Sequence, residues 1–374
     1  MNTTAILEWS ASVRVIETSG AEGRFSRPRP GRAEALDPYV SVIVTAYNRR
    51  RYLPEALRSL EAQTLDKGRF EVIVVKNFED AVSDAIIRRN GWRWVYSDER
   101  SQGRFALAGL EEARGEVLTF LEDDDMYVPE RLHAVKKAFE EVNDLVYFHN
   151  AQVVIDEEGR VVGTNGAGPD LLVNDPAMHC RELFVDPGGF HNASSIAFSS
   201  ALADKLAEAL AGVGSSIDLM IMVVAAVSGG KMLLSGRALT MWRVHGASST
   251  PHSYSSREGG WRESVSGLAR AYSAWARDAA HALELLAEHP CRPYAEHLEL
   301  VRRLEASAAP DWALQDRPRS SPVDFLRAVR LRLGGRMKGD LKLMAVLAVD
   351  SFVARAPNPV REAWWRLRWR LGRS

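Results

Sequence analysis

The sequence contains only two cysteines, Cys180 and Cys291, and has no long uninterrupted hydrophobic run. The cysteines are far apart and fit no metal-binding or redox spacing, so neither a disulfide framework nor a zinc site is expected. Residues 341–354, the longest apolar stretch near the C-terminus, include Lys342 and Asp350 and fall short of the roughly 20 residues that span a membrane. No secretory signal is recognised, so the expected location is a reducing cytoplasm.

The net charge is also close to zero, but the formal value of −1 hides an uneven distribution of charge along the chain. Residues 317–374 are strongly basic and the remainder is acidic. Residues 364–371 (WWRLRWRL) alternate Trp, Leu and Arg, a composition that suits the headgroups of an anionic membrane. The alternative is that these tryptophans pack against the protein itself. Nucleic acid is not an expected partner, because the acidic remainder would repel it and no zinc-finger or helix-turn-helix motif is present.

The hydrophobic pattern divides the 374 residues into four segments. Residues 1–38 combine a strand-like alternation with a linker, 251–316 have a helical pattern, and 317–374 form the basic amphipathic tail. Between them, residues 39–250 alternate strands and helices. Strands are expected at 40–46, 70–75, 92–96 and 117–121, and helices at 53–65, 81–89 and 105–113. This order predicts an α/β fold with a mostly parallel, Rossmann-like sheet flanked by helices, and ligands at the carboxyl ends of its strands.

Four consecutive carboxylates, Glu122 to Asp125, follow the predicted strand 117–121. Like charges this close raise one another's pKa unless a divalent cation or several donors absorb the charge. Oxygen ligands suit Mg²⁺ or Mn²⁺, which accept phosphate oxygens in their open positions. The alternative is a solvated acidic turn before a helix at 129–142, with Pro129 in its first position.

The pattern changes after that helix, where a site for an acceptor is expected. A short strand at 145–148 and a hairpin at 153–162 come first. Further on, Asp218 precedes an apolar helix at 219–227, and residues 239–244 are strand-like.

Residues 39–250 resemble the family-2 glycosyltransferases of the GT-A fold. The resemblance rests on six segments that occur in the family's order: 40–49 (VSVIVTAYNR), 52–63 (YLPEALRSLEAQ), 70–75 (FEVIVV), 113–116 (ARGE), 122–129 (EDDDMYVP) and 242–246 (WRVHG). Each segment alone is weakly specific, but their fixed order is specific and favours a metal site over an acidic turn.

The resemblance implies a nucleotide-sugar site. Thr45 and Tyr47 would hold the nucleotide, with the tyrosine ring beside the base, and Asp123 would lie next to the ribose. Asn77 stands where the family usually carries an aspartate that reads the base, and an amide can also donate and accept hydrogen bonds. Arg104 would contact phosphate in place of the family's usual Arg-Asn pair nearby.

The resemblance also implies the reacting groups. Asp124 and Asp125 would bind Mn²⁺ or Mg²⁺, with His245 approaching the metal from the acceptor side. Asp218 would be the catalytic base, although an aspartate before an apolar helix is also an ordinary helix cap. A departing nucleoside diphosphate develops negative charge, which explains why a Lewis acid is needed.

The expected activity is therefore that of an inverting, metal-dependent glycosyltransferase. It would move a sugar from a nucleotide-sugar donor to a glycan or a lipid-linked saccharide, at the cytoplasmic face of the cell membrane. The alternative is a weak or inactive nucleotide-sugar-binding subunit of a glycan-assembly complex. A nucleotidyltransferase is disfavoured, because the sequence has no glycine-rich, lysine-bearing phosphate loop.

Overall fold

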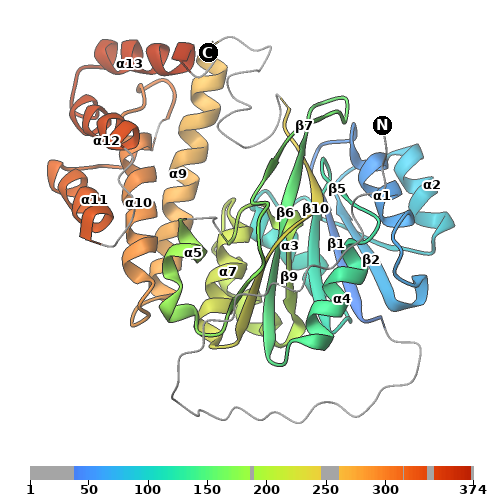
Figure 1. The fold of residues 1–374 in the computed structure, drawn as a ribbon. Coiled ribbons are helices and arrows are strands. Elements are labelled where there is room, and N and C mark those ends of the chain that lie inside the picture. The colour runs from blue at the N-terminus through green and yellow to red at the C-terminus, as the bar shows by residue number, and fades with distance from the viewer. Residues whose placement is uncertain (1–37, 186–188, 246–260, 315, 335–340, 372–374) are drawn as a thin grey trace.

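The computed structural model describes residues 38–185, 189–245, 261–314, 316–334 and 341–371. The predicted N-terminal strand and linker therefore fall outside the described residues, apart from residue 38. The described chain forms a sheet domain followed by a group of C-terminal helices (Figure 1).

One ten-stranded sheet runs through the first domain in the order β3-β2-β1-β4-β9-β6-β10-β5, with β7 and β8 paired to β6 and β10. Strands β3, β2, β1 and β4 are parallel, whereas β9 runs antiparallel to both β4 and β6. The strands are β1 Val40–Ala46, β2 Phe70–Lys76, β3 Arg93–Tyr96, β4 Val117–Glu122, β5 Met126–Tyr127, β6 Leu145–Ile155, β7 Val161–Asn165, β8 Leu171–Val173, β9 Ile196–Ser199 and β10 Lys231–Arg243.

Helices cover both faces of this sheet, because successive strand residues point to opposite sides. Ile43 of β1 belongs to a core with α3, α6 and α7, while its neighbours Val42 and Val44 belong to a second core with α1, α2 and α4. The helices are α1 Leu53–Glu61, α2 Ala81–Arg89, α3 Gln102–Leu110, α4 Arg131–Glu141, α5 Cys180–Phe184, α6 Ala203–Leu210 and α7 Ile217–Ser228. The predicted fold class is confirmed.

Several boundaries differ from the prediction: for example, α1 ends at Glu61 rather than at residue 65, and α3 spans Gln102–Leu110 rather than residues 105–113. Helix α4 begins at Arg131, since Pro129 and Glu130 form a turn before it. Strand β6 extends from residue 145 to 155 without interruption, because it pairs with β9 and β10 through its middle before it forms the predicted hairpin with β7.

The C-terminal helices form a layer beside the sheet domain (Figure 1). They are α9 Trp261–Leu285, α10 Arg292–Ser307, α11 Pro322–Gly334, α12 Leu341–Val353 and α13 Asn358–Leu371. A disulfide between Cys180 in α5 and Cys291 before α10 joins this layer to the sheet domain. The expectation that the two cysteines form no disulfide framework is therefore wrong. Folding brings together residues that are 111 positions apart, which their spacing in the sequence does not reveal.

The basic tail is part of this helical layer. Trp365 is only 1% exposed, and its Nε1 donates to the Ala308 carbonyl at 2.9 Å. Trp364 Nε1 donates to Asp350 Oδ1 at 2.7 Å. The structure therefore supports the alternative that these two tryptophans pack against the protein itself. Among the described residues, no helix combines the length and the apolar character that crossing a membrane requires.

Candidate active site

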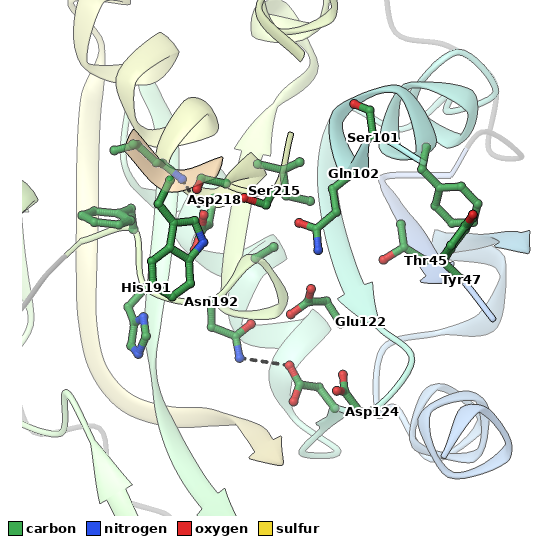
Figure 2. Close-up of a pocket in the computed structure, with 18 of the residues that line it drawn as sticks. Thr45, Tyr47, Ser101, Gln102, Glu122, Asp124, His191, Asn192, Ser215 and Asp218 are labelled. Carbon is green, nitrogen blue, oxygen red and sulfur yellow. Dashed lines mark hydrogen bonds between the residues drawn. The ribbon is translucent and has the colours of Figure 1, made fainter. Parts of the chain in front are cut away.

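A cavity of about 480 Å³ lies at the carboxyl ends of β1 and β4. Figure 2 shows Thr45 and Tyr47 on one side, Glu122 and Asp124 near the middle, and Asn192 and Asp218 on the other side. The sequence alone predicted four of these six residues as ligand-binding or catalytic groups, with Glu122 as a supporting acid. Folding brings them into one pocket, although they come from elements that are up to about 170 residues apart.

The β1 side of the pocket has the expected polar and aromatic groups. Thr45 pairs in register with Glu122 of β4, and its carbonyl accepts a hydrogen bond from the Asp123 amide at 3.1 Å. The ring of Tyr47 meets Phe105 of α3 edge-on, with the centroids 5.5 Å apart. A flat ring held in this way offers a planar surface to a nucleobase.

Three residues predicted to bind the nucleotide, Asn77, Arg104 and Asp123, do not line this cavity. Asn77 follows β2, where its side chain donates to Asn48 Oδ1 at 2.9 Å and accepts from the Asn48 amide at 2.8 Å. Arg104 is exposed on α3. Its neighbour Gln102 lines the cavity instead, because the first turn of α3 points toward the strand ends.

The acidic cluster is divided between the pocket and an internal ion pair. Glu122, Asp124 and Asp125 each offer a carboxylate oxygen within 4.8 Å of the others, a spacing that a metal ion could bridge. Asp123 points elsewhere and accepts a hydrogen bond from Arg49 Nε at 3.2 Å. Arg49 NH1 also lies 2.6 Å from Asp124 Oδ2, so one guanidinium holds two neighbouring carboxylates.

Burial and mutual repulsion make this cluster hard to ionise. Burial, and then the charges of Asp124 and Asp125, raise the pKa of Glu122 well above its ordinary value. Burial raises the pKa of Asp125 to about 7 and that of Asp123 to about 8. Burial would also raise the pKa of Asp124, but Arg49 and His245 outweigh it and the pKa is lowered. The all-oxygen donor set and its excess of acid therefore fit a hard divalent cation.

His245 lies behind this cluster rather than in the cavity wall. Its Nε2 is 2.9 Å from Asp124 Oδ2, and its ring lies against Tyr52, with centroids 4.9 Å apart. In this position the imidazole orients Asp124, which would be the residue that faces a ligand.

Sequence reasoning missed two residues that hold Asp125. Asn192 adopts a left-handed backbone conformation, with φ at 70°, and donates from Nδ2 to Asp125 Oδ2 at 2.9 Å. The Arg243 amide donates to Asp125 Oδ1 at 2.9 Å, and Arg243 Nε donates to the Asp124 carbonyl. Asn is one of the few residues that readily adopt this conformation, but the sequence gives no sign that Asn192 meets Asp125.

Asp218 lies in the first turn of α7, two residues after the N-cap position occupied by Ser216. Its carboxylate lines the cavity and accepts a hydrogen bond from the Leu219 amide at 2.8 Å. Burial raises its pKa to about 6. A carboxylate whose pKa is near neutrality is suited to taking a proton from a hydroxyl group.

Comparison with known proteins relates part of this chain to glycosyltransferases. Residues 41–176 match the family described as "Glycosyl transferase family 2". An uncharacterized glycosyltransferase of Haemophilus influenzae is 30% identical over 172 residues, which cover 41% of this chain and 57% of that protein. The chain thus spans little more than half the length of this curated relative, and less of several others.

Solved structures with a related arrangement include Staphylococcus aureus TarS 1–349 in complex with UDP and the Pyrobaculum calidifontis mannosyltransferase PcManGT in complex with GDP-Man and Mn²⁺. The first has a TM-score of 0.47 and 16% identity, over 87% of this chain and 91% of that one. The second has a TM-score of 0.47 and 17% identity, over 90% of this chain and 86% of that one. These structural likenesses are distant. Residues 41–176 of this chain match a family-2 glycosyltransferase domain, and they form the first part of the described sheet domain.

Proposed function

We propose that this protein is an inverting glycosyltransferase that uses a nucleotide-sugar donor and a divalent cation, Mn²⁺ or Mg²⁺. The observation that supports this best is that one cavity is lined by Thr45 and Tyr47, the acid cluster and Asp218. The nucleotide would lie against the first two, its diphosphate beside Asp124, and the acceptor near Asp218.

Glu122, Asp124 and Asp125 would hold the cation, which when bound would stabilise the charge on the leaving diphosphate. Arg49 shares Asp124 with this site, so its guanidinium would shift toward Asp123 when the cation binds. Asn192 and Arg243 keep Asp125 in place throughout, because they bond to both of its oxygens.

Asp218 would act as the base in a single displacement. The oxygen of the acceptor hydroxyl bonds to the anomeric carbon, while the bond from that carbon to the diphosphate oxygen breaks and leaves its electron pair on the diphosphate. The hydroxyl proton passes to Asp218. Attack from the face opposite the leaving group inverts the anomeric configuration.

An inactive nucleotide-sugar-binding subunit is a second candidate. The observation in its favour is that Arg49 already neutralises Asp123 and Asp124, as a protein without a catalytic metal would require. A panel of nucleotide sugars, incubated with and without EDTA in Mn²⁺ buffer, separates the two. An enzyme will release nucleoside diphosphate only when the metal is present, whereas a binding subunit will show ligand-dependent thermal stabilisation without turnover.

We also propose that the acceptor is a glycan or a lipid-linked saccharide and that the protein works at the cytoplasmic face of a membrane. The support is an apolar and basic surface on the C-terminal helices. Phe352 of α12 is 75% exposed and Leu367 of α13 is 47% exposed, and the exposed arginines Arg330 and Arg366 lie on α11 and α13. Exposed apolar side chains among cations suit an anionic lipid surface.

A further inference from the structure

The C-terminal helices contribute directly to the wall of the cavity. Trp275 of α9 and Leu298 and Arg302 of α10 line it together with Asp218 of the sheet domain. Phe190 and Trp242 of the sheet domain also line it. The sequence predicted the helical segment as an appendage, but folding makes it part of the pocket.

Aromatic rings dominate this part of the wall. Trp242 meets the ring of His191 edge-on, with the centroids 5.2 Å apart. The Arg302 guanidinium lies 5.1 Å from the centre of the Trp275 ring, which fixes the indole in place. Both tryptophans are half-buried, so part of each ring is open to the cavity. The electron-rich face of an indole attracts the weakly positive C–H groups on the face of a sugar ring.

Charged residues of both signs line the cavity, including Arg49, Arg100 and Arg243, but the groups beside Trp275 do not favour an anionic ligand. Arg302 NH1 forms an ion pair with Glu305 at 2.8 Å, so its charge is already balanced within α10. Asp218 lines the same cavity and, when ionised, would repel a phosphate or a carboxylate on the acceptor. A ligand that has hydroxyl groups and no charge can lie on the aromatic wall and avoids this repulsion.

On the basis of the glycosyl transfer proposed above, we infer that α9 and α10 form the acceptor subsite, and that this subsite takes a neutral carbohydrate. A sugar ring lies on the Trp275 indole, the Arg302 guanidinium donates to its hydroxyl groups, and the reacting hydroxyl reaches Asp218.

Binding of neutral trisaccharides built from hexoses and N-acetylhexosamines, measured by saturation-transfer NMR, tests this inference without relying on turnover. Wild-type protein should bind at least one of them more tightly than its phosphorylated counterpart. Trp275→Ala should weaken that binding about tenfold, because the stacking surface is lost, and Trp275→Phe should restore most of it. Trp312→Ala is the matched control, since Trp312 packs against Trp261 in the same layer and does not line the cavity.

Three results would overturn the inference: no neutral trisaccharide binds, a phosphorylated sugar binds better, or Trp275→Ala behaves like the Trp312→Ala control. Release of nucleoside diphosphate by the wild-type protein, with water as the acceptor, tests the proposed function separately. If the wild-type protein fails to catalyse even that reaction, the proposed function fails instead, and the binding experiment still reports on the subsite.

A separate observation concerns Asp278, a buried residue of α9. Its Oδ1 accepts from the Gly214 amide at 2.8 Å, and its Oδ2 accepts from the amides of Ser215 and Ser216 at 2.9 Å each. The Ser216 side chain, at the N-cap of α7, makes no capping hydrogen bond, and Asp278 from another element instead binds the backbone amides that lead into this helix. Asp218 lies two residues further along the chain.

The geometry points to Asp278 as a positioning residue for Asp218. Asp278→Ala should lower kcat for transfer about tenfold or more while the KM for the donor stays unchanged, because the loop before α7 loses its acceptors. Asp278→Glu should recover part of the rate. An unchanged kcat, or a loss no larger than that of the Trp312→Ala control at equal melting temperature, would overturn this role.

Discussion

The pocket of the sheet domain and the layer of C-terminal helices both bury acidic side chains, but they surround them differently. In the helices, Asp350 contacts Arg368 at 3.0 Å and Trp364 at 2.7 Å, and Glu305 contacts both Arg302 and Arg368. In the described part of the pocket, no Lys or Arg side chain forms an ion pair with Glu122 or Asp125. Those two carboxylates face a cavity instead.

Burial has the same effect on single groups in both regions, since it raises the pKa of Asp350 and of Asp125 to about 7. The two regions differ in the groups that surround the buried acids. Fixed arginines and an indole N–H surround Asp350, whereas Glu122 and Asp125 face the cavity with no Lys or Arg ion-pair partner among the described residues. Buried charge is therefore structural in one region and, by our proposal, functional in the other.

The largest effect is expected from Asp124→Asn. It removes a carboxylate that faces the cavity, and metal-dependent binding of a nucleoside diphosphate should become undetectable by calorimetry, while the fold persists because Arg49 keeps its bond to Asp123. The matched control is Asp123→Asn. Asp123 pairs with Arg49 and does not line the cavity, so this variant should bind the nucleotide with an affinity closer to that of the wild type. Equal affinities in wild type and Asp124→Asn would exclude the metal site.

The next largest effect is expected from Asp218→Asn. This variant should bind the donor normally and lose about 10² or more in transfer rate, because the amide cannot take the acceptor proton. In the wild-type protein, kcat should fall as the pH drops through about 6, where a carboxylate with this raised pKa becomes protonated. A rate that stays constant between pH 5 and 8, or an Asp218→Asn variant that turns over normally, would place the base elsewhere.

The link between the two regions can be broken at the disulfide. Replacing Cys180 and Cys291 together by serine should lower the free energy of unfolding by about 2–4 kcal/mol, because the oxidised chain closes a long loop. Urea denaturation of the double variant and of the oxidised protein measures the difference. Wild-type protein treated with a reducing agent is the control and should match the variant. Mass spectrometry that finds both thiols free in protein from cells would agree with a reducing compartment.

The smallest effect is expected at the surface of the helical layer. Phe352→Glu should reduce flotation with vesicles that contain anionic lipids and leave the melting temperature unchanged, since the side chain is 75% exposed. Val82→Glu is the control, because Val82 is 50% exposed on α2 of the sheet domain and lies outside the basic surface. If wild-type protein does not float with such vesicles, membrane attachment through these helices is ruled out.

Local patterns in the sequence predicted the elements that carry the site. The apolar run at 40–46 and the helix at 81–89 have the predicted boundaries, because alternation, periodicity and capping act over a few residues. The capping aspartate Asp80, which accepts from the Ser83 amide, is an example of such a local signal. The position of the acid cluster could be predicted in the same way, because its carboxylates lie directly at the end of β4.

The sequence by itself therefore determined the class of fold, the order of its elements and the acids at the strand end. Only the tertiary structure decided which side chains share the pocket. It brought Asn192 to Asp125 and Asp278 to the start of α7, placed Trp275 in the cavity wall, and left Asn77 and Arg104 outside that wall. These contacts join residues about 60 or more positions apart, and nothing in the local spacing records them, because they arise only when separate elements pack together.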